Sequence, residues 1–241
     1  MATITSAGSG DWDAGGTWTG GAIPHVTNDL VQIQSGHNVT LTDNESTGTL
    51  YILSGGTITG GGYTLTLDEG GGNPIFDNDG TISGVLDVTI TGGTSRGLDL
   101  YSGAGNVRNL VINSSGQTFT LVQSGVTHTL DGNLTITAGT LDTDDIALTV
   151  TGDVSLANNT TLTCNASTCS FGSIDIGSSG AVLNGSSGTT TITAQEAVSG
   201  MGWENNRGAN GYVHNNGTVK FTDNASCLLY TSPSPRDRTR S

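Results

Sequence analysis

Short clusters of aspartate are the residues of this chain that could do chemistry. Asp142, Asp144 and Asp145 lie together in LDTDDI, and Asp77 and Asp79 flank one asparagine in FDNDG. Glycoside hydrolysis uses two carboxyl groups at a fixed separation across a sugar-binding groove. Aspartate is also common in turns, because its side chain hydrogen-bonds nearby backbone there. Turns are the preferred interpretation of both clusters, and we predict no catalytic residue.

Patterns of metal ligands are weak in this sequence. The segment DNDG at residues 77–80 has the oxygen-rich spacing of a calcium loop, but it lacks the downstream glutamate of an EF-hand. The histidines are scattered, and Cys164 and Cys169 have no second cysteine pair to complete a zinc site. We therefore predict no metal and no cofactor, and expect these two cysteines to be stacked or bridged in a turn.

Aromatic side chains that could stack on sugar rings are scarce, because Phe, Trp and Tyr make up 5% of the chain. Trp203, Tyr212 and Tyr101 are the ones that we predict as glycan contacts. The acidic clusters add possible hydrogen-bond acceptors. The complete set of predicted glycan contacts is Trp203, Tyr212, Tyr101, Asp142, Asp144 and Asp145.

Composition excludes several classes of protein. The 241 residues include 21 acidic and 7 basic side chains, for a net charge of −14. Such a surface cannot neutralise phosphates, so we predict no nucleic-acid partner. No apolar run is long enough to cross a bilayer, so we predict no membrane insertion. The first residues, MATITSAGSGDW, lack the basic and apolar regions of a secretory signal peptide.

The residues that would position any site are arranged in short strands. Gly, Thr, Ser and Asn dominate, helix-forming residues do not cluster, and turn residues separate short β-branched runs. One signature recurs, in which a polar residue precedes two apolar residues at positions i and i+2. The first apolar residues of its copies are 18 to 26 residues apart and are Val39, Leu65, Val88, Leu110, Leu134, Val154, Ile174 and Ile192.

A period near twenty residues predicts a solenoid, in which stacked rungs bury a core that no single rung could bury alone. Because alternate residues of a strand face opposite sides, the apolar pair is expected inside. We predict an all-β, right-handed parallel β-helix with rungs of about 18–26 residues; the alternative is a β-sandwich or jelly roll, which also has evenly spaced short strands.

The chain divides into four predicted segments. Residues 1–36 form an N-terminal cap in which Trp12 and Trp18 cover the end of the core, and residues 37–193 form the β-helix. Residues 194–226 are a terminal rung or the entry to a truncated domain. Residues 227–237, CLLYTSPSPRD, resemble the translation of a transposase-type sequencing adapter. We therefore expect residues 227–241 to be a non-native tail, with the natural protein cut near Ser226.

The segment GDWDAGGTWTGGAIPHVTNDLVQIQSGHNVTLTD at residues 10–43 resembles the opening of G8-type domains and their relatives in bacterial surface proteins and phage structural proteins. The resemblance runs through Trp18, Pro24, Asp29, Val31 and Val39, among others. A later stretch, GNLTITAGTLDTDDIALTVTGDVSL, is similar in composition to repeats of such glycine- and threonine-rich proteins. The resemblance implies adhesive, structural or carbohydrate-associated roles, and it transfers no catalytic residue.

The first functional hypothesis is a non-enzymatic structural or adhesive module of a phage tail, a virion or a bacterial surface protein. Its location would be the virion or the cell surface. Cell-surface glycans are the expected partner, and analogy with tail fibres suggests a homotrimer. The alternative is a tailspike-like protein that binds or degrades polysaccharide. A less favoured hypothesis is ice binding by stacked Thr-x-Thr motifs, such as that of Thr64 and Thr66.

Overall fold

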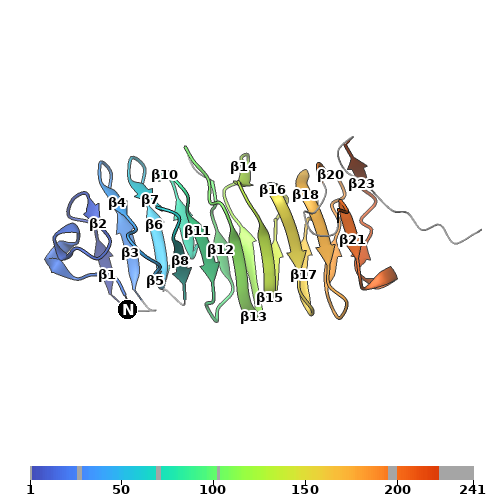
Figure 1. The fold of residues 1–241 in the computed structure, drawn as a ribbon, viewed down its shortest axis with the longest axis horizontal. Helices are drawn as coiled ribbons and strands as arrows, with labels where there is room; N and C mark the ends of the chain where they lie inside the picture. Colours follow the sequence, from blue (N-terminus) through green and yellow to red (C-terminus); the bar gives the residue numbers. More distant parts are fainter. Residues whose placement is uncertain (1, 26–28, 69–71, 102–103, 195–199, 223–241) are drawn as a thin grey trace, which may run out of the picture.

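The computed structural model describes residues 2–25, 29–68, 72–101, 104–194 and 200–222. It confirms the predicted all-β solenoid, with about seven turns of parallel sheet and 4% helix. Every pair of named strands is parallel, which excludes the alternative sandwich of antiparallel sheets. In Figure 1 the molecule is an elongated rod, with β1 (Thr3–Thr5) at one end and β23 (Thr218–Phe221) at the other. The predicted tail, residues 227–241, lies outside the described residues.

Each rung contributes strands to three parallel ladders, which we number in the order that the chain visits them. Several long strands bend and serve two ladders. Ladder 1 contains β1, β3 (Leu30–Ile33), β6 (Thr49–Ile52), β9 (Phe76–Asn78), β12 (Arg96–Leu98), the ends of β13 (Leu110–Leu121) and β15 (Leu134–Asp142), β17 (Thr160–Thr163), β19 (Val182–Asn184) and β22 (Tyr212–Val213).

Ladder 2 contains β2 (Gly10–Asp11), β4 (Asn38–Thr40), β7 (Thr57–Thr59), β10 (Thr81–Ser83), β14 (Thr127–Leu130), the starts of β16 (Ala147–Leu156) and β18 (Cys169–Ile176), β20 (Thr189–Ile192) and β23. Isolated bridges of Ala104 and Val107 connect β10 to β14. Ladder 3 contains β5 (Glu45–Thr47), β8 (Thr64–Leu67), β11 (Asp87–Ile90), the remaining halves of β13, β15, β16 and β18, and β21 (Trp203–Asn205).

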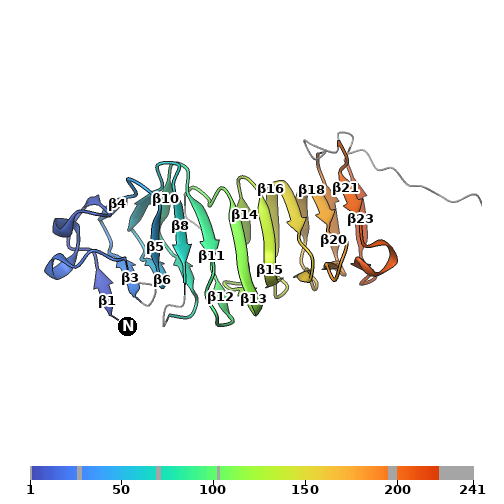
Figure 2. The ribbon, with the colours of Figure 1, turned by 60° about the horizontal axis from the view of Figure 1, so that its bottom comes forward.

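The first end of the rod is closed by a loop that carries two short 3₁₀ helices, η1 (Gly15–Thr17) and η2 (Thr19–Gly21). Figure 2 shows this loop in blue beyond β1. Trp12 and Trp18 are buried in it and pack edge to face, with ring centroids 5.1 Å apart. The third 3₁₀ helix, η3 (Gly208–Asn210), lies at the opposite end. No helix of the described residues is long and apolar enough to cross a membrane.

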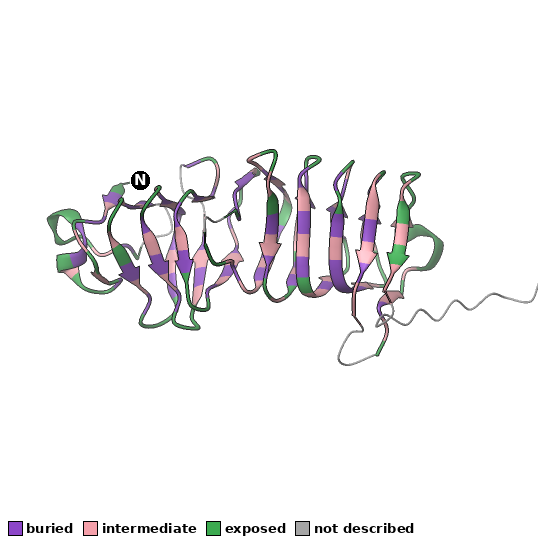
Figure 3. Ribbon diagram, turned by 90° about the horizontal axis from the view of Figure 1, so that it is seen from above, coloured by how far each residue is buried: buried purple, intermediate pink, exposed green. Residues whose placement is uncertain are grey.

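The predicted apolar repeat follows ladder 3 through its central six copies. The first apolar residues of neighbouring copies pair directly, in the order Leu65, Val88, Leu110, Leu134, Val154 and Ile174. They form one buried column, and the alternation of buried and more exposed residues along the strands is visible in Figure 3. The repeat in the sequence also places Val39 and Ile192, the two outer copies, in this series. That prediction is wrong, because both residues lie on strands of ladder 2.

The parallel ladders also extend beyond residues 37–193. At the first end, β1 pairs with β3 in ladder 1. At the last end, β21, β22 and β23 each add one strand to a different ladder and together form a terminal rung. Rung stacking therefore continues from Thr3 to Phe221 through the described residues.

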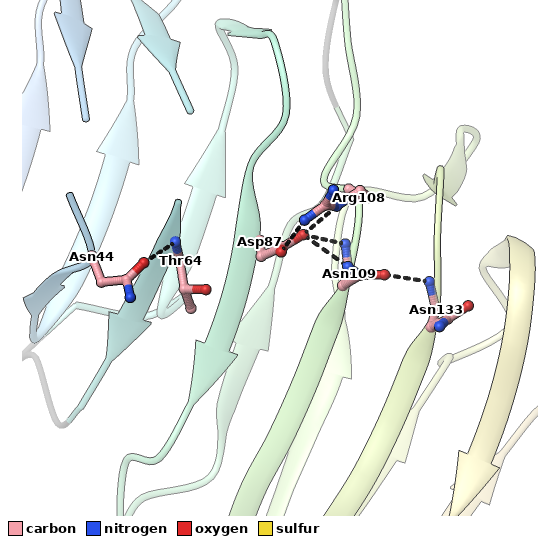
Figure 4. Close-up of polar contacts among 6 residues, drawn as sticks. All are labelled: Asn44, Thr64, Asp87, Arg108, Asn109 and Asn133. Carbon is pink, nitrogen blue, oxygen red and sulfur yellow. Dashed lines mark hydrogen bonds and ion pairs between the residues drawn. The ribbon is translucent and has the colours of Figure 1, made fainter. Parts of the chain in front are cut away.

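A column of polar side chains runs along the corner that precedes ladder 3. Most of these residues sit directly before an apolar pair, whereas Asn44 precedes Glu45, and the side-chain oxygen of each accepts a hydrogen bond from the next rung (Figure 4). The backbone N–H of Asn133 donates to Asn109 Oδ1 at 2.8 Å, and that of Asp153 donates to Asn133 Oδ1 at 2.9 Å. Earlier in the column, the Thr64 N–H donates to Asn44 Oδ1 at 2.9 Å. The polar residue of the repeat thus fastens one rung to the next.

Asp87 is one of two aspartates in this polar column, the other being Asp153. It accepts hydrogen bonds from the backbone N–H and the side-chain amide of Asn109, and it forms an ion pair with Arg108. Burial alone would raise the pKa of Asp87, but the donors of Arg108 and Asn109 outweigh it and lower the pKa below its ordinary value. Asp87 therefore stays ionised as part of the fold.

Glycine precedes the polar residue in three successive rungs, at Gly132, Gly152 and Gly172. A Cβ atom built on Gly152 would overlap Asn133 Oδ1, which reaches past it to the N–H of Asp153. The glycine is therefore required by this close approach and not by its backbone conformation, since its φ is not positive. This close approach explains why glycine precedes the polar residue in the pairs Gly132-Asn133 and Gly152-Asp153.

We expect Gly152→Ala to destabilise the protein by about 1–3 kcal/mol, because the new methyl group displaces the Asn133 amide and forces the rungs apart. Gly8→Ala is the matched control, since a Cβ at Gly8 meets no atom within 4 Å. Denaturant unfolding of both variants measures the difference. Equal stabilities would contradict the role of the glycine.

Candidate functional site

Two of the predicted glycan contacts lie side by side at the last end of the rod. Trp203 and Tyr212 pack edge to face with centroids 5.1 Å apart, and Phe221 lies 6.5 Å from Trp203. Trp203 pairs with Ile174, Tyr212 with Leu183, and Phe221 with Ile192. These aromatic residues therefore occupy core columns of the terminal rung, where they remain partly exposed.

The acidic cluster at residues 142–145 lies at the corner between ladders 1 and 2. Asp144 and Asp145 form the predicted turn, both with positive φ, and Asp142 ends strand β15. Asp142 Oδ1 accepts hydrogen bonds from the Asp144 N–H and the Asn165 amide, and Asp145 Oδ1 accepts the N–H of Ala166. These carboxylates hold their own turn and join it to the next rung.

The structure does not bring the predicted glycan contacts into one site. Along ladder 1, Asp142 is three rungs from Val213 of the terminal rung, which corresponds to about 14 Å at the usual spacing of strands. Tyr101, with 36% of its surface exposed, follows β12 nearer the middle of the rod. The aromatic and acidic residues are separate features.

Three other carboxylates meet on the flank of ladder 1. One carboxylate oxygen each of Asp77, Asp79 and Asp99 lies within 4.8 Å of the others, and we call these residues the Asp99 cluster. The predicted turn is wrong for Asp77, which lies inside strand β9, whereas Asp79 lies in the bend that follows. Asp99 comes from the next rung and is 3% exposed. Sequence spacing links Asp77 with Asp79 but gives no indication of Asp99.

Burial controls the protonation of the Asp99 cluster. It raises the pKa of Asp99 to about 7, a shift that the Tyr101 N–H opposes and the charges of Asp77 and Asp79 increase. His128 Nδ1 lies 3.8 Å from Asp99 and accepts the N–H of Leu100. Because burial lowers the pKa of His128, this ring is neutral at physiological pH. A carboxyl group half-protonated near neutral pH is thus held behind the exposed flank.

A groove of about 360 Å³ lies beside this cluster. Its lining comes from three successive rungs and consists of Asn73, Ser95, Arg96, Gly97, Thr118, Thr120 and Val122. Polar side chains that line a concave surface can bind a polar ligand such as a sugar. The groove is small and lies on the side of the rod, between the rungs of β12 and β13.

Arg96 is the cationic residue of this groove. Its Nη1 donates to the Gly72 carbonyl at 2.7 Å, whereas its buried Nε has no acceptor among the described residues. Tyr51 lies near both Arg96 and Asp77; burial and then the charge of Asp77 raise the pKa of its hydroxyl. Arg96 therefore brings a positive charge to the groove, and the neutral phenol of Tyr51 lies next to the groove residue Asn73.

This arrangement fits binding better than hydrolysis. Glycoside hydrolysis needs two carboxyl groups that both reach the sugar. Burial raises the pKa of both Asp77 and Asp99 in this cluster, and Asp99 is buried away from the surface. Arg96, Tyr51 and Asp99 were missed at the sequence level. Arg96 and Asp99 come from the rung of β12 and Tyr51 comes from the rung of β6, and no motif marks them. A register alignment of the rungs would have placed Tyr51 next to Asp77.

Two groups of carboxylates in the described residues are close enough to share a cation. One is the Asp99 cluster, and the other consists of Asp13, Asp43 and Glu45 at the first end of the rod. Cys164 and Cys169 are buried free thiols on adjoining segments. The thiol–thiol hydrogen bond and then burial raise the pKa of Cys164 well above its ordinary value, so it is protonated.

Comparison with known proteins gave no match to a family model, to a curated protein or to a solved structure.

Replacing Asp99 by asparagine is expected to alter the pH dependence of stability between about pH 4 and pH 7. The pKa of Asp99 is 3.8 in the unfolded chain and about 7 in the folded protein. Between these values the folded protein binds this proton and the unfolded chain does not, so the free energy of unfolding falls as pH rises. The Tm of the wild type relative to Asp99→Asn should therefore fall across this range and then level off.

The contribution of His128 is present in both proteins and largely cancels in this comparison. Asp144→Asn, which removes an exposed carboxylate in a turn, should follow the wild-type curve. Parallel curves for wild type and Asp99→Asn would show that the pKa of Asp99 is not raised.

Proposed function

We propose that this chain is a structural or adhesive β-solenoid module of a phage tail, a virion or a bacterial surface protein, and that it works without catalysis. The observation that supports this most is the continuity of the three ladders from the cap to the terminal rung. The rungs are bonded to their neighbours by backbone ladders, and the polar column adds side-chain bonds between several of them. Such a rod keeps its two ends at a fixed separation, which is what a spacer must do.

The surface chemistry agrees with exposure to solvent on all flanks. The outward positions of ladder 3 carry Thr66, Thr89, Thr135 and Ser155, small hydroxyl side chains that are well solvated and suit strands. The charge of −14 disfavours association with nucleic acid. Cell-surface glycans are the proposed adhesive partner, and a homotrimer is the proposed assembly.

Ice binding is less well supported by the same column. An ice-binding face requires an unbroken flat row of threonines, whereas Val111 and Asp175 occupy outward positions of ladder 3 in register with Thr135 and Ser155. With Ser155, three of the six outward positions are therefore not threonine.

A passive rod should survive a nonspecific protease and leave polysaccharides intact. We expect proteinase K to spare the ladder strands between Thr3 and Phe221, because ladder bonding holds their backbone closed. Incubation with a panel of bacterial surface polysaccharides should leave their chain length unchanged on size-exclusion chromatography. Heat-unfolded protein is the control for protease activity. Shortened polysaccharide would overturn the non-enzymatic role, and rapid fragmentation would overturn the rigid one.

The groove on ladder 1 favours a second candidate function, the binding of an acidic glycan. Arg96 brings a positive charge to the groove, beside the hydroxyl groups of Thr118 and Thr120. A sugar carboxylate would give Arg96 a charge-assisted partner, and the threonine hydroxyls would accept or donate hydrogen bonds to the ring. This candidate is compatible with an adhesive module.

Arg96→Gln should weaken the binding of uronic-acid oligosaccharides about tenfold, the loss that corresponds to one charge-assisted hydrogen bond. Arg207→Gln is the matched control, because Arg207 also donates Nη1 to a carbonyl at 2.7 Å, that of Ala181, near the far end of the rod. Calorimetric titration measures both. Equal affinities for the two variants would exclude the groove as the binding site.

A further inference from the structure

Three carboxylates from two loops converge at the corner where ladder 3 begins. Asp13 belongs to the cap and follows the buried Trp12. Asp43 lies in the loop after β4, and Glu45 is the first residue of β5. One oxygen of each lies within 4.8 Å of the other two. We call Asp13, Asp43 and Glu45 the Glu45 site.

Glu45 is the unusual member, because it points into the core and not into solvent. It pairs with Leu65 and so begins the apolar column of ladder 3. Its side chain is 9% exposed, and its Oε1 atom has no hydrogen-bond donor in the part of the chain that the structure describes. A buried carboxylate oxygen without a donor is costly unless a proton or a cation satisfies it.

The surroundings of Glu45 increase this cost. Burial raises its pKa to about 8, and the nearby carboxylates of Asp13 and Asp43 add to the shift. Asp13 and Asp43 are both exposed, so solvent reaches the site from one side. A cation could therefore enter from water and contact all three carboxylates.

We propose that Asp13, Asp43 and Glu45 bind one calcium ion that joins the cap to the first strand of ladder 3. The donors of the site are oxygen atoms alone, which suits Ca²⁺ and disfavours Zn²⁺. Ca²⁺ accepts six to eight oxygen ligands in flexible geometry, so water completes its shell on the exposed side, whereas Mg²⁺ demands an octahedron. With three carboxylates, the expected Kd is about 10⁻⁴–10⁻³ M, as in other extracellular modules.

The surrounding hydrogen bonds already bring the two loops together. The Trp12 N–H donates to the Thr40 carbonyl at 2.8 Å, and Thr42 Oγ1 donates to Asp13 Oδ2 at 3.3 Å. Asn44 is held by the next rung through its bond to Thr64. The bound ion would replace the repulsion of three carboxylates by a shared attraction and so would fix the cap on the rod.

Terbium is a suitable probe, because it replaces calcium at oxygen sites and emits when a neighbouring tryptophan is excited. Trp12 is the sequence neighbour of Asp13, whereas the Asp99 cluster lies beside Tyr51. We expect titration of the full chain with Tb³⁺, excited where tryptophan but not tyrosine absorbs, to give saturable emission that Ca²⁺ displaces. Absence of tryptophan-sensitised emission would overturn the proposal.

Two variants and two controls assign the emission to the Glu45 site. Glu45→Gln keeps the shape of the buried side chain, and Asp13→Asn changes an exposed one, so both are expected to fold. Each should lower Tb³⁺ affinity at least tenfold. Asp144→Asn and Asp79→Asn remove carboxylates elsewhere and should bind as the wild type does. Wild-type affinity in either Glu45-site variant, or loss of binding in Asp79→Asn, would overturn the assignment.

Thermal unfolding provides a readout that does not depend on the probe. Calcium at about a hundred times its Kd should raise the Tm of the wild type by roughly 5 °C or more, since it binds the folded state. The increase should vanish in Glu45→Gln, whose own Tm in chelator should equal or exceed that of the wild type. An unchanged Tm of the wild type on adding calcium would mean that a proton satisfies Glu45, and it would overturn the proposal.

Discussion

Each rung of this solenoid has to offer the next rung a hydrogen-bond acceptor at the corner where the chain turns into ladder 3. At several of these corners the acceptor is a side-chain oxygen, as Asn109 is for Asn133 and Asn133 is for Asp153, whereas the N–H of Asp87 donates to the carbonyl of Tyr63. The small residue before the corner follows from this bond, because the amide passes where a Cβ would lie. The apolar pair after the corner then enters the core in register.

This corner explains which parts of the fold the sequence could predict. The repeat consists of a polar residue followed by two apolar residues that are two positions apart. The polar residue makes the corner bond, and the apolar residues fill the core. The prediction failed for Val39 and Ile192, since ladder 2 also begins with a polar residue followed by an apolar one. Strand periodicity identifies the inward residues, but it does not say which of three similar sides of the rung a strand occupies.

The candidate site was less predictable for a related reason. Tyr51 and Asp99 both lie near Asp77 because the rungs of β6, β9 and β12 stack, yet these rungs differ in length and carry no shared motif there. The register across β6, β9 and β12 becomes known only when the loops between them are placed. Asp77 and Asp79 could be recognised as a pair, because they are close in sequence. The third carboxylate could not.

Three of the polar residues buried in this core, His128, Asn78 and Glu45, differ in what surrounds their polar atoms. His128, fully buried in ladder 2, accepts the N–H of Leu100 and donates to the Val122 carbonyl, so it supplies the bonds that the irregular rung at residues 104–107 does not. Asn78 is equally buried, and neither polar atom of its side chain has a partner among the described residues.

Glu45 differs from both, because it lies at the end of its column, next to solvent and to two further carboxylates. At the end of a solenoid core, a bound ion that enters from solvent can satisfy a buried charged group. The opposite end of the same column holds Trp203, which packs on Tyr212 and Phe221 and needs no such partner. The two ends of one apolar column are thus closed in chemically different ways, and only the first provides ligands for an ion.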